Sequence, residues 1–132
     1  MKKLILSVLS LILAIGLVGC ANPNEIAPEK MKTIKFLNEA ENKALFSDVK
    51  VVGKSYKYKN GFDVDFRADG TYSGTVADGK KSISGTWNVK GDVKCMDGDD
   101  GRKRCAKHYK EGDKYYTVKG NILTSEFIFI KK

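Results

Sequence analysis

Three carboxylates stand close together in the stretch Asp97-Gly98-Asp99-Asp100-Gly101, and oxygen ligands of this kind could hold a hard cation such as calcium. The spacing departs from the calcium-loop pattern, because the third acid and the glycine each come one residue early and no glutamate stands at the closing position. The next residues, Arg102, Lys103 and Arg104, would neutralise the carboxylates. We therefore predict a solvated turn here, with no metal and no cofactor.

His108 is the only histidine, and it is the residue to test first for catalysis. A catalytic histidine needs a nucleophile and an orienting acid around it, and the sequence shows no nucleophile elbow or other local signature of such a site. A zinc site would need ligands that the chain lacks. The sequence predicts an ordinary surface or rim histidine and a protein that is not an enzyme.

Cys20 has the clearest chemistry of the cysteines because of the residues before it. Lys2 and Lys3 form a positive start, an apolar run follows from Leu4 to Val18, and the run ends in Leu17-Val18-Gly19-Cys20. The run is short for a membrane span and ends in small residues, as a signal peptide does. The last four residues resemble the lipobox of bacterial lipoproteins. That resemblance implies cleavage before Cys20 and a diacylglycerol thioether on its thiol.

Export, which the lipobox implies, decides how the other two cysteines are interpreted. Cys95 and Cys105 would lie in an oxidising compartment, where an even pair predicts a disulfide. A redox pair would more typically be spaced Cys-x-x-Cys. The bridge would close a short loop and contribute somewhat under roughly 3 kcal/mol.

Basic residues are concentrated in one part of the chain. The formal net charge of +8 falls to +6 when residues 1–19 are removed, and residues 80–119 alone hold eleven basic and six acidic side chains. An anionic lipid, a phosphorylated glycan or an acidic protein fits this charge, whereas export argues against nucleic acid. The alternative is a solvated lysine-rich surface that only aids solubility. The candidate surface for an anionic partner is the basic group nearest the predicted disulfide: Arg102, Lys103, Arg104 and Lys107.

The chain divides into three parts. Residues 1–19 are the predicted lipoprotein signal peptide, residues 20–29 contain both prolines and are predicted to form a flexible tether, and residues 30–132 form a single β-rich domain. Apolar residues recur at helical spacing from Lys30 to about Phe46. This spacing predicts one helix, with Asn38 as an alternative start.

After Val49 the pattern changes to the alternation of half-buried strands. Phe62, Val64 and Phe66 alternate with charged residues, and the stretch 83–89 repeats the pattern. We predict a mainly β (α+β) fold, in which an antiparallel meander of about seven or eight strands forms a small barrel or half-barrel with one N-terminal helix. The predicted turns are Asn60-Gly61, Asp69-Gly70, Asp78-Gly79, Gly91-Asp92, Gly112-Asp113 and Gly120-Asn121.

The last predicted strand, Ile122 to Ile130, is apolar on both faces near its end and must be covered by the first strand or by the helix. Gly74 and Gly85, inside strands, indicate a bend or the close approach of another backbone. Aromatic side chains could line a ligand cavity, but at strand spacing they favour a core. These side chains are Phe62, Phe66, Tyr72, Trp87, Tyr115 and Tyr116.

A series of short motifs runs through the domain. In order they are Phe66-Arg67-Ala68-Asp69-Gly70-Thr71, Gly85-Thr86-Trp87-Asn88-Val89, Cys95, Arg104-Cys105 and Glu111-Gly112-Asp113-Lys114-Tyr115. This order resembles a domain-of-unknown-function family of small exported proteins from Gram-negative bacteria, especially alphaproteobacteria. The resemblance covers roughly Leu37 to Val118, and it departs at the final turn, where the family has Asp-Gly-Asp. It implies the fold and the disulfide, and no established activity.

These observations predict a lipid-anchored periplasmic protein that acts as a non-catalytic binding or envelope-support module. Ala21 is not the aspartate that retains lipoproteins at the inner membrane of enteric bacteria, so we expect the periplasmic face of the outer membrane. One alternative is a lipocalin-like carrier of a small hydrophobic ligand, which needs an interior larger than its aromatic residues can fill. The other is an inhibitor or exclusion factor against an exported enzyme or a phage receptor, for which the 95–105 loop is the candidate.

Overall fold

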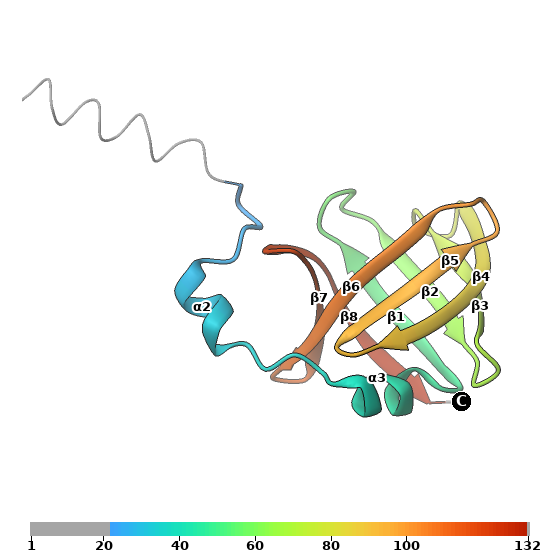
Figure 1. Cartoon of the computed structure of the whole chain (residues 1–132). Helices are drawn as coiled ribbons and strands as arrows, with labels where there is room; N and C mark the ends of the chain where they lie inside the picture. Colours follow the sequence, from blue (N-terminus) through green and yellow to red (C-terminus); the bar gives the residue numbers. More distant parts are fainter. Residues whose placement is uncertain (1–21, 132) are drawn as a thin grey trace, which may run out of the picture.

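Turns at glycine and alternating apolar side chains divide the chain after Asp48 into eight strands (Figure 1). The computed structural model describes residues 22–131, so the predicted signal peptide and Cys20 lie outside the described residues. The elements are α2 (Pro28–Thr33), α3 (Glu39–Phe46), β1 (Val49–Ser55), β2 (Gly61–Phe66), β3 (Thr71–Val76), β4 (Lys81–Lys90), β5 (Val93–Gly98), β6 (Lys103–Glu111), β7 (Lys114–Lys119) and β8 (Ile122–Lys131).

The strands form a closed antiparallel barrel. Each strand pairs with its neighbour in sequence, and β1 also pairs with β8, so that Val51 lies opposite Val64 on one side and Phe129 on the other. The predicted mainly β meander is therefore confirmed, and the barrel is closed. Pairing with β1 covers the edge of β8 and turns Phe129 inward, but Ile128 and Ile130 remain 44% and 45% exposed on its outer face.

The single helix predicted for residues 30–46 is in fact two short helices with an extended link between them. The last β5–β6 pair joins Lys94 to Ala106, so the edge of β6 beyond Ala106 is left without a β5 partner. The link occupies this edge: Phe36 forms a bridge with Tyr109, and the N–H of Leu37 donates to the carbonyl of His108 at 2.8 Å. The link can form these hydrogen bonds with β6 only if its backbone is extended. The helix is therefore interrupted between α2 and α3.

Asn38, the alternative helix start, begins α3. Its side chain accepts a hydrogen bond from the N–H of Glu41 at 2.8 Å, and the Glu41 carboxylate accepts one from the N–H of Asn38 at 3.1 Å. This reciprocal arrangement is a capping box, which satisfies two N–H groups that a helix start leaves without partners.

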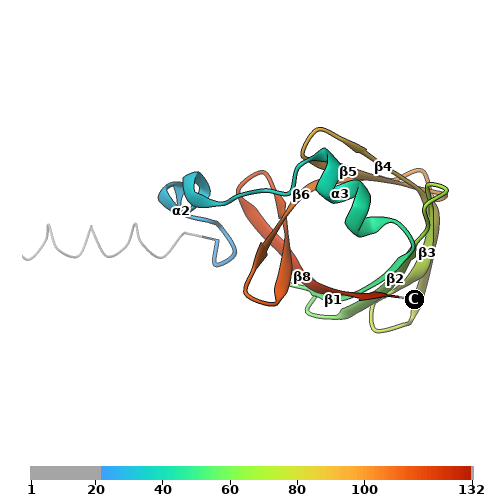
Figure 2. The ribbon, with the colours of Figure 1, turned by 90° about the horizontal axis from the view of Figure 1, so that it is seen from below.

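α3 lies across one open end of the barrel (Figure 2). Phe46, at its C-terminal end, is 1% exposed, and its ring centre lies 5.0 Å from that of Phe129 and 5.2 Å from that of Phe66. Trp87 packs in the same cluster and donates from Nε1 to the carbonyl of Arg67 at 2.9 Å. The prediction that the strand aromatics form a core is confirmed for Phe66, Tyr72 and Trp87.

Gly74 and Gly85 lie where neighbouring strands come very close. A Cβ atom at Gly74 would collide with the carbonyl oxygen of Asp63, and one at Gly85 would collide with that of Asp97. The predicted close approach of another backbone is therefore confirmed at both glycines.

Residues 22–37 run along the outside of β6, β7 and β8, where Ile26, Tyr109 and Val118 form a second buried cluster. The N–H of Ile26 donates to the carbonyl of Asn121 at 2.8 Å, and the N–H of Leu123 donates to the carbonyl of Asn24 at 2.9 Å. The part of the predicted flexible tether from Asn24 onward is therefore packed against the barrel. Backbone hydrogen bonds and the buried side chain of Ile26 hold it there.

Candidate functional site

The end of the barrel opposite α3 is formed by four hairpin loops (Figure 1). We call this end the basic rim and define it by residues 54–60, 77–81, 97–104 and 119–121. These segments carry nine basic and four acidic side chains. The segments at the α3 end, residues 39–50, 67–71, 90–93, 110–114 and 131, carry seven of each. The charge excess of the domain therefore lies at one end of the barrel.

Lysines of the β1–β2 loop make the largest contribution to this excess. Lys54, Lys57 and Lys59 are exposed, and residues 54–60 contain no acid. Within residues 22–131 none of these three lysines forms an ion pair, and the same holds for Lys80 and Lys81 of the β3–β4 turn. The ammonium groups at this end are consequently available to an outside anion.

The basic run Arg102-Lys103-Arg104 lies on the rim as predicted, but its charge is offset by acids of its own loop. The Asp100 carboxylate accepts from the N–H of Arg102 at 3.0 Å and lies 3.9 Å from its guanidinium. This backbone hydrogen bond, helped by Arg104 and Arg102, lowers the pKa of Asp100. Asp99 accepts from Ser84 Oγ at 2.6 Å. A hollow of about 330 Å³ beside these groups is lined by acidic as well as basic side chains. The acidic side chains weaken the attraction of an anion to this hollow.

Lys107, the fourth residue of the predicted surface, lies apart from the other three. Its Nζ is 3.2 Å from the Asp92 carboxylate in the β4–β5 turn, at the α3 end, and 5.3 Å from the centre of the Phe36 ring. The structure thus brings together Arg102, Lys103 and Arg104 but not Lys107. Sequence reasoning missed Lys54, Lys57 and Lys59, because the first half of the chain is balanced in charge overall and only the fold separates its lysines from its acids.

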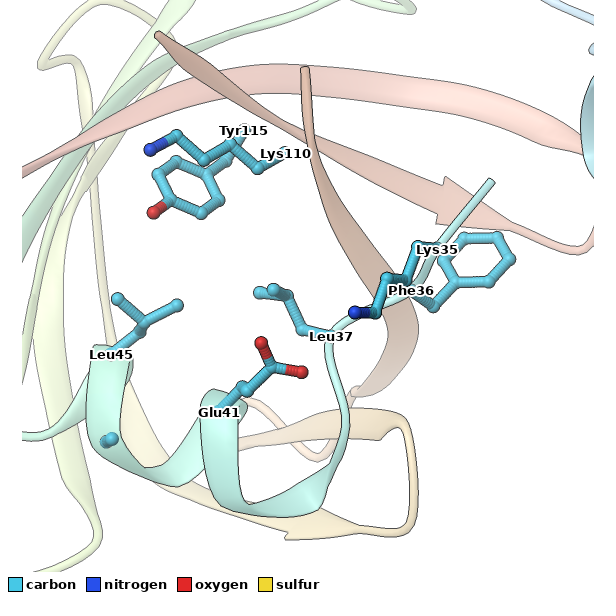
Figure 3. A pocket seen from close by; sticks show the side chains of 8 residues that line it. Lys35, Phe36, Leu37, Glu41, Leu45, Lys110 and Tyr115 are labelled. Carbon is cyan, nitrogen blue, oxygen red and sulfur yellow. The ribbon is translucent and has the colours of Figure 1, made fainter. Parts of the chain in front are cut away.

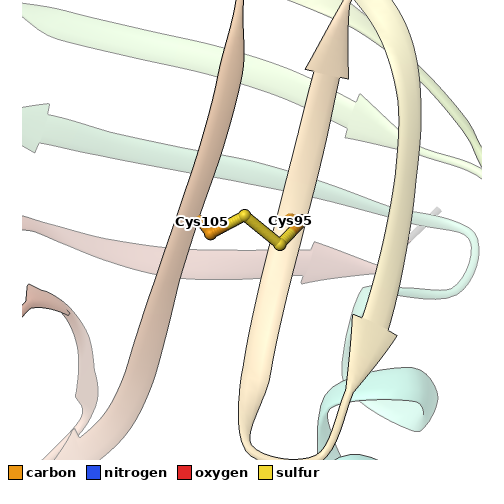
Figure 4. Close-up of a disulfide and its surroundings, with 2 residues drawn as sticks. All are labelled: Cys95 and Cys105. Carbon is orange, nitrogen blue, oxygen red and sulfur yellow. A yellow bond between two sulfur atoms is a disulfide. The ribbon is translucent and has the colours of Figure 1, made fainter.

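The predicted disulfide between Cys95 and Cys105 is present (Figure 4). The two residues are direct partners in the β5–β6 register, with Cα atoms 4.0 Å apart. The bridge therefore joins the two strands that lead into the 97–104 loop, so that this part of the rim is held by a covalent bond as well as by the sheet.

Inside the barrel, Lys94 is a charged residue among aromatic rings. It is 5% exposed, and its Nζ lies 3.9 Å from the ring centre of Phe46 and 4.1 Å from that of Phe66. Within residues 22–131 it forms no ion pair. Burial lowers the pKa of Lys94 to about 7, while the faces of the two rings stabilise the ammonium.

His108 is buried beside this lysine, at 4% exposure, so the prediction of a surface or rim histidine is wrong. Its Nδ1 lies 3.1 Å from Thr117 Oγ1. Burial, and then the charge of Lys94, hold the pKa of His108 well below its ordinary value. The imidazole packs against the rings of Phe46 and Phe127, so His108 is part of the barrel core.

A hollow of about 490 Å³ opens between α3 and the β6–β7 hairpin (Figure 3). Leu37, Leu45 and Tyr115 form its apolar lining, with Lys35, Glu41 and Lys110 around them. It is partly open to the surface, and the rings around Phe46 pack in the core beside it.

Comparison with known protein families, with curated proteins and with solved structures gave no match. None of the helices within residues 22–131 has the length and apolar character needed to cross a bilayer.

Proposed function

We propose that this protein is a lipid-anchored, non-catalytic module whose basic rim lies on the anionic headgroups of the membrane that holds Cys20. The observation that carries the proposal is where the N-terminal segment leaves the barrel. Ile26 and Asn24 are hydrogen-bonded to Asn121 and Leu123, at the β7–β8 turn, which belongs to the basic rim. The segment that leads toward Cys20 therefore leaves the barrel at the end that carries the charge excess.

The distance between the barrel and the anchor is short. Asn24 is the first described residue that bonds to the barrel, and the four residues from Cys20 to Asn24 span at most about 14 Å. A lipid on Cys20 would therefore hold the β7–β8 turn close to the bilayer surface. Exposed charges act over about 8 Å at physiological salt, so the rim lysines would lie within reach of the headgroups.

The free lysines of the rim supply the attraction. A lysine near an anionic bilayer surface contributes about 1 kcal/mol, which is about a fivefold change in the population of the bound orientation. No acid lies within residues 54–60, and Glu126, which is opposite Lys54 in the β1–β8 register, already forms an ion pair with Lys114 at 2.9 Å. The opposite orientation would present the α3 end, where acids and bases cancel.

The interior supports this proposal over the carrier alternative. A carrier needs an internal volume for its ligand, and here the rings around Phe46 pack against one another in the core at the α3 end. The inhibitor alternative requires a protruding 95–105 loop. In this structure most of that segment belongs to the paired strands β5 and β6, which the disulfide joins.

Lysine accessibility in vesicles tests the orientation. The full-length lipidated protein would be reconstituted in vesicles of phosphatidylcholine alone or with phosphatidylglycerol and treated with an amine acylating reagent. We expect anionic vesicles to slow acylation of Lys57 and Lys59 severalfold, and salt to reduce this protection. Lys90 and Lys131, at the α3 end, serve as internal controls. Equal acylation of both groups in both kinds of vesicle would overturn the proposal.

Charge reversal provides the matched mutants. Lys54→Glu, Lys57→Glu and Lys59→Glu combined should abolish the protection of the remaining rim lysines. The same triple change at Lys90, Lys110 and Lys131 should leave it intact. Equal effects from the two triple mutants would mean that the charge serves solubility alone.

A further inference from the structure

Tyr58 is the most exposed large apolar side chain of the described residues, at 69%. It lies between Lys57 and Lys59 in the β1–β2 loop of the basic rim. The chain from Val49 to Phe62 contains four lysines and no acid. A ring this exposed contributes nothing to the core. It lies at the end of the barrel from which the N-terminal segment leads toward Cys20.

The backbone holds this loop in a defined shape. The N–H of Tyr58 donates to Ser55 Oγ at 3.3 Å, and the N–H of Ser55 donates to the carbonyl of Asn60 at 2.9 Å. The N–H of Gly61 donates to the Asp78 carboxylate at 2.6 Å, which ties the loop to the β3–β4 turn. A loop whose backbone is ordered in this way loses little further backbone freedom when its side chains enter another environment.

We propose that Tyr58 is an interfacial anchor that inserts into the headgroup–acyl boundary of the bilayer. Tyrosine is suited to this boundary because its ring is apolar while its hydroxyl can stay hydrated. Lys57 and Lys59 would meet lipid phosphates on either side, with their apolar stems along the ring. The Lys57 Nζ already lies 5.3 Å from the Tyr58 ring centre.

This inference rests on the proposed orientation and adds a contact that electrostatics alone would not produce. Attraction of lysines to headgroups is screened by salt, whereas burial of a ring is not. With Tyr58 inserted, part of the membrane contact should therefore persist at high salt. The exposed pair Ile128 and Ile130 lies along the side of β8, away from the rim loops, and would take no part.

Depth-dependent quenching tests the insertion. The full-length lipidated Tyr58→Trp variant would be placed in anionic vesicles that carry bromine at defined depths of the acyl chain. We expect the strongest quenching by bromine nearest the headgroups. The unsubstituted protein, in which Trp87 is 8% exposed inside the barrel, and Asn88→Trp, on the outer face of β4, are the controls and should be quenched little.

Substitution at the same position separates the ring from the charge. Tyr58→Ser should accelerate acylation of Lys57 and Lys59 in anionic vesicles at high salt, whereas Tyr58→Phe should not. If Tyr58→Trp is quenched no more than Asn88→Trp while the rim lysines stay protected at low salt, the insertion is overturned and the proposed function stands. If that protection is absent as well, both are overturned.

Discussion

The Nζ of Lys94 lies 3.9 Å from the centre of the Phe46 ring, so the buried cation of β5 is in direct contact with the helix that closes the barrel. Phe46 also packs against His108, with ring centres 5.3 Å apart. One aromatic side chain of α3 thus contacts both Lys94 and His108. The stability of the contact between α3 and the barrel consequently depends on the protonation of Lys94 in β5 and His108 in β6.

Replacing Lys94 by Met should stabilise the protein and remove part of its pH dependence. The pKa of Lys94 falls from its ordinary value of 10.5 to about 7 on folding, so between these pH values the unfolded chain binds more protons. The free energy of unfolding therefore rises with pH over this range, and the cost of burying the ammonium, up to about 5 kcal/mol, is complete below pH 7. His108, with its lowered pKa, adds a further loss of stability below its ordinary value of 6.5.

Urea unfolding at a series of pH values measures this effect. Lys94→Met should show a flatter profile between pH 7 and 10.5 than the parent protein. Lys90→Met, at an exposed position of β4, is the control and should leave the profile unchanged. An unchanged slope in Lys94→Met would contradict the lowered pKa.

Phe46→Ala should lower the free energy of unfolding by about 3 to 5 kcal/mol, because it removes a buried ring and leaves a cavity at the contact of α3 with the barrel. Ala44→Gly tests helix propensity alone and should cost about 1 kcal/mol. Unfolding monitored through Trp87, whose ring centre is 6.4 Å from that of Phe46, compares the two. Equal losses would show that α3 acts through its helicity and not through its contact with the core.

Gly85→Ala should destabilise the domain severely, since the added Cβ collides with the carbonyl of Asp97 on the neighbouring strand. Thr86→Ala, one residue further along and exposed, should change stability little. Thermal unfolding followed by circular dichroism would compare them. A stable Gly85→Ala protein would mean that β4 and β5 can separate without cost at this point.

Breaking the disulfide should have a modest effect. Cys95→Ser with Cys105→Ser removes a bridge of ten-residue separation and should lower stability by somewhat under roughly 3 kcal/mol, because the β5–β6 ladder remains. Mass spectrometry of the non-reduced protein should show the two cysteines linked. Free thiols in freshly isolated protein, or complete unfolding of the double mutant, would contradict these expectations.

Cys20→Ala should abolish lipid labelling and release a soluble or unprocessed form. The expectation follows from the lipobox-like Leu17-Val18-Gly19-Cys20. Metabolic labelling with a fatty acid and partitioning into detergent would measure it. Unchanged mass and membrane partitioning in the mutant would show that another feature holds the protein to the membrane.

The sequence was sufficient for the features that depend on local chemistry. Alternation around Val64 and glycine turns such as Asp69-Gly70 predicted the meander, and an even pair of exported cysteines predicted the disulfide. Lys94 was missed because lysine is almost always exposed, although it shares the inward phase of β5 with Met96. Ile26 and Phe36 were missed because their partners lie on β6 and β8, far away in sequence.

Closure of the barrel also determines the order in which the chain can fold. Every strand contact except one joins neighbours in sequence, and the exception, β1 with β8, joins residues 49–55 to 125–131. Until β8 has formed, one edge of β1 has no partner strand. The unpaired β8 also carries an exposed apolar run, Phe127-Ile128-Phe129-Ile130. During this interval neighbouring copies of the chain could pair wrongly through these edges. We expect refolding yields to fall with protein concentration, even though the native barrel has no edge to offer.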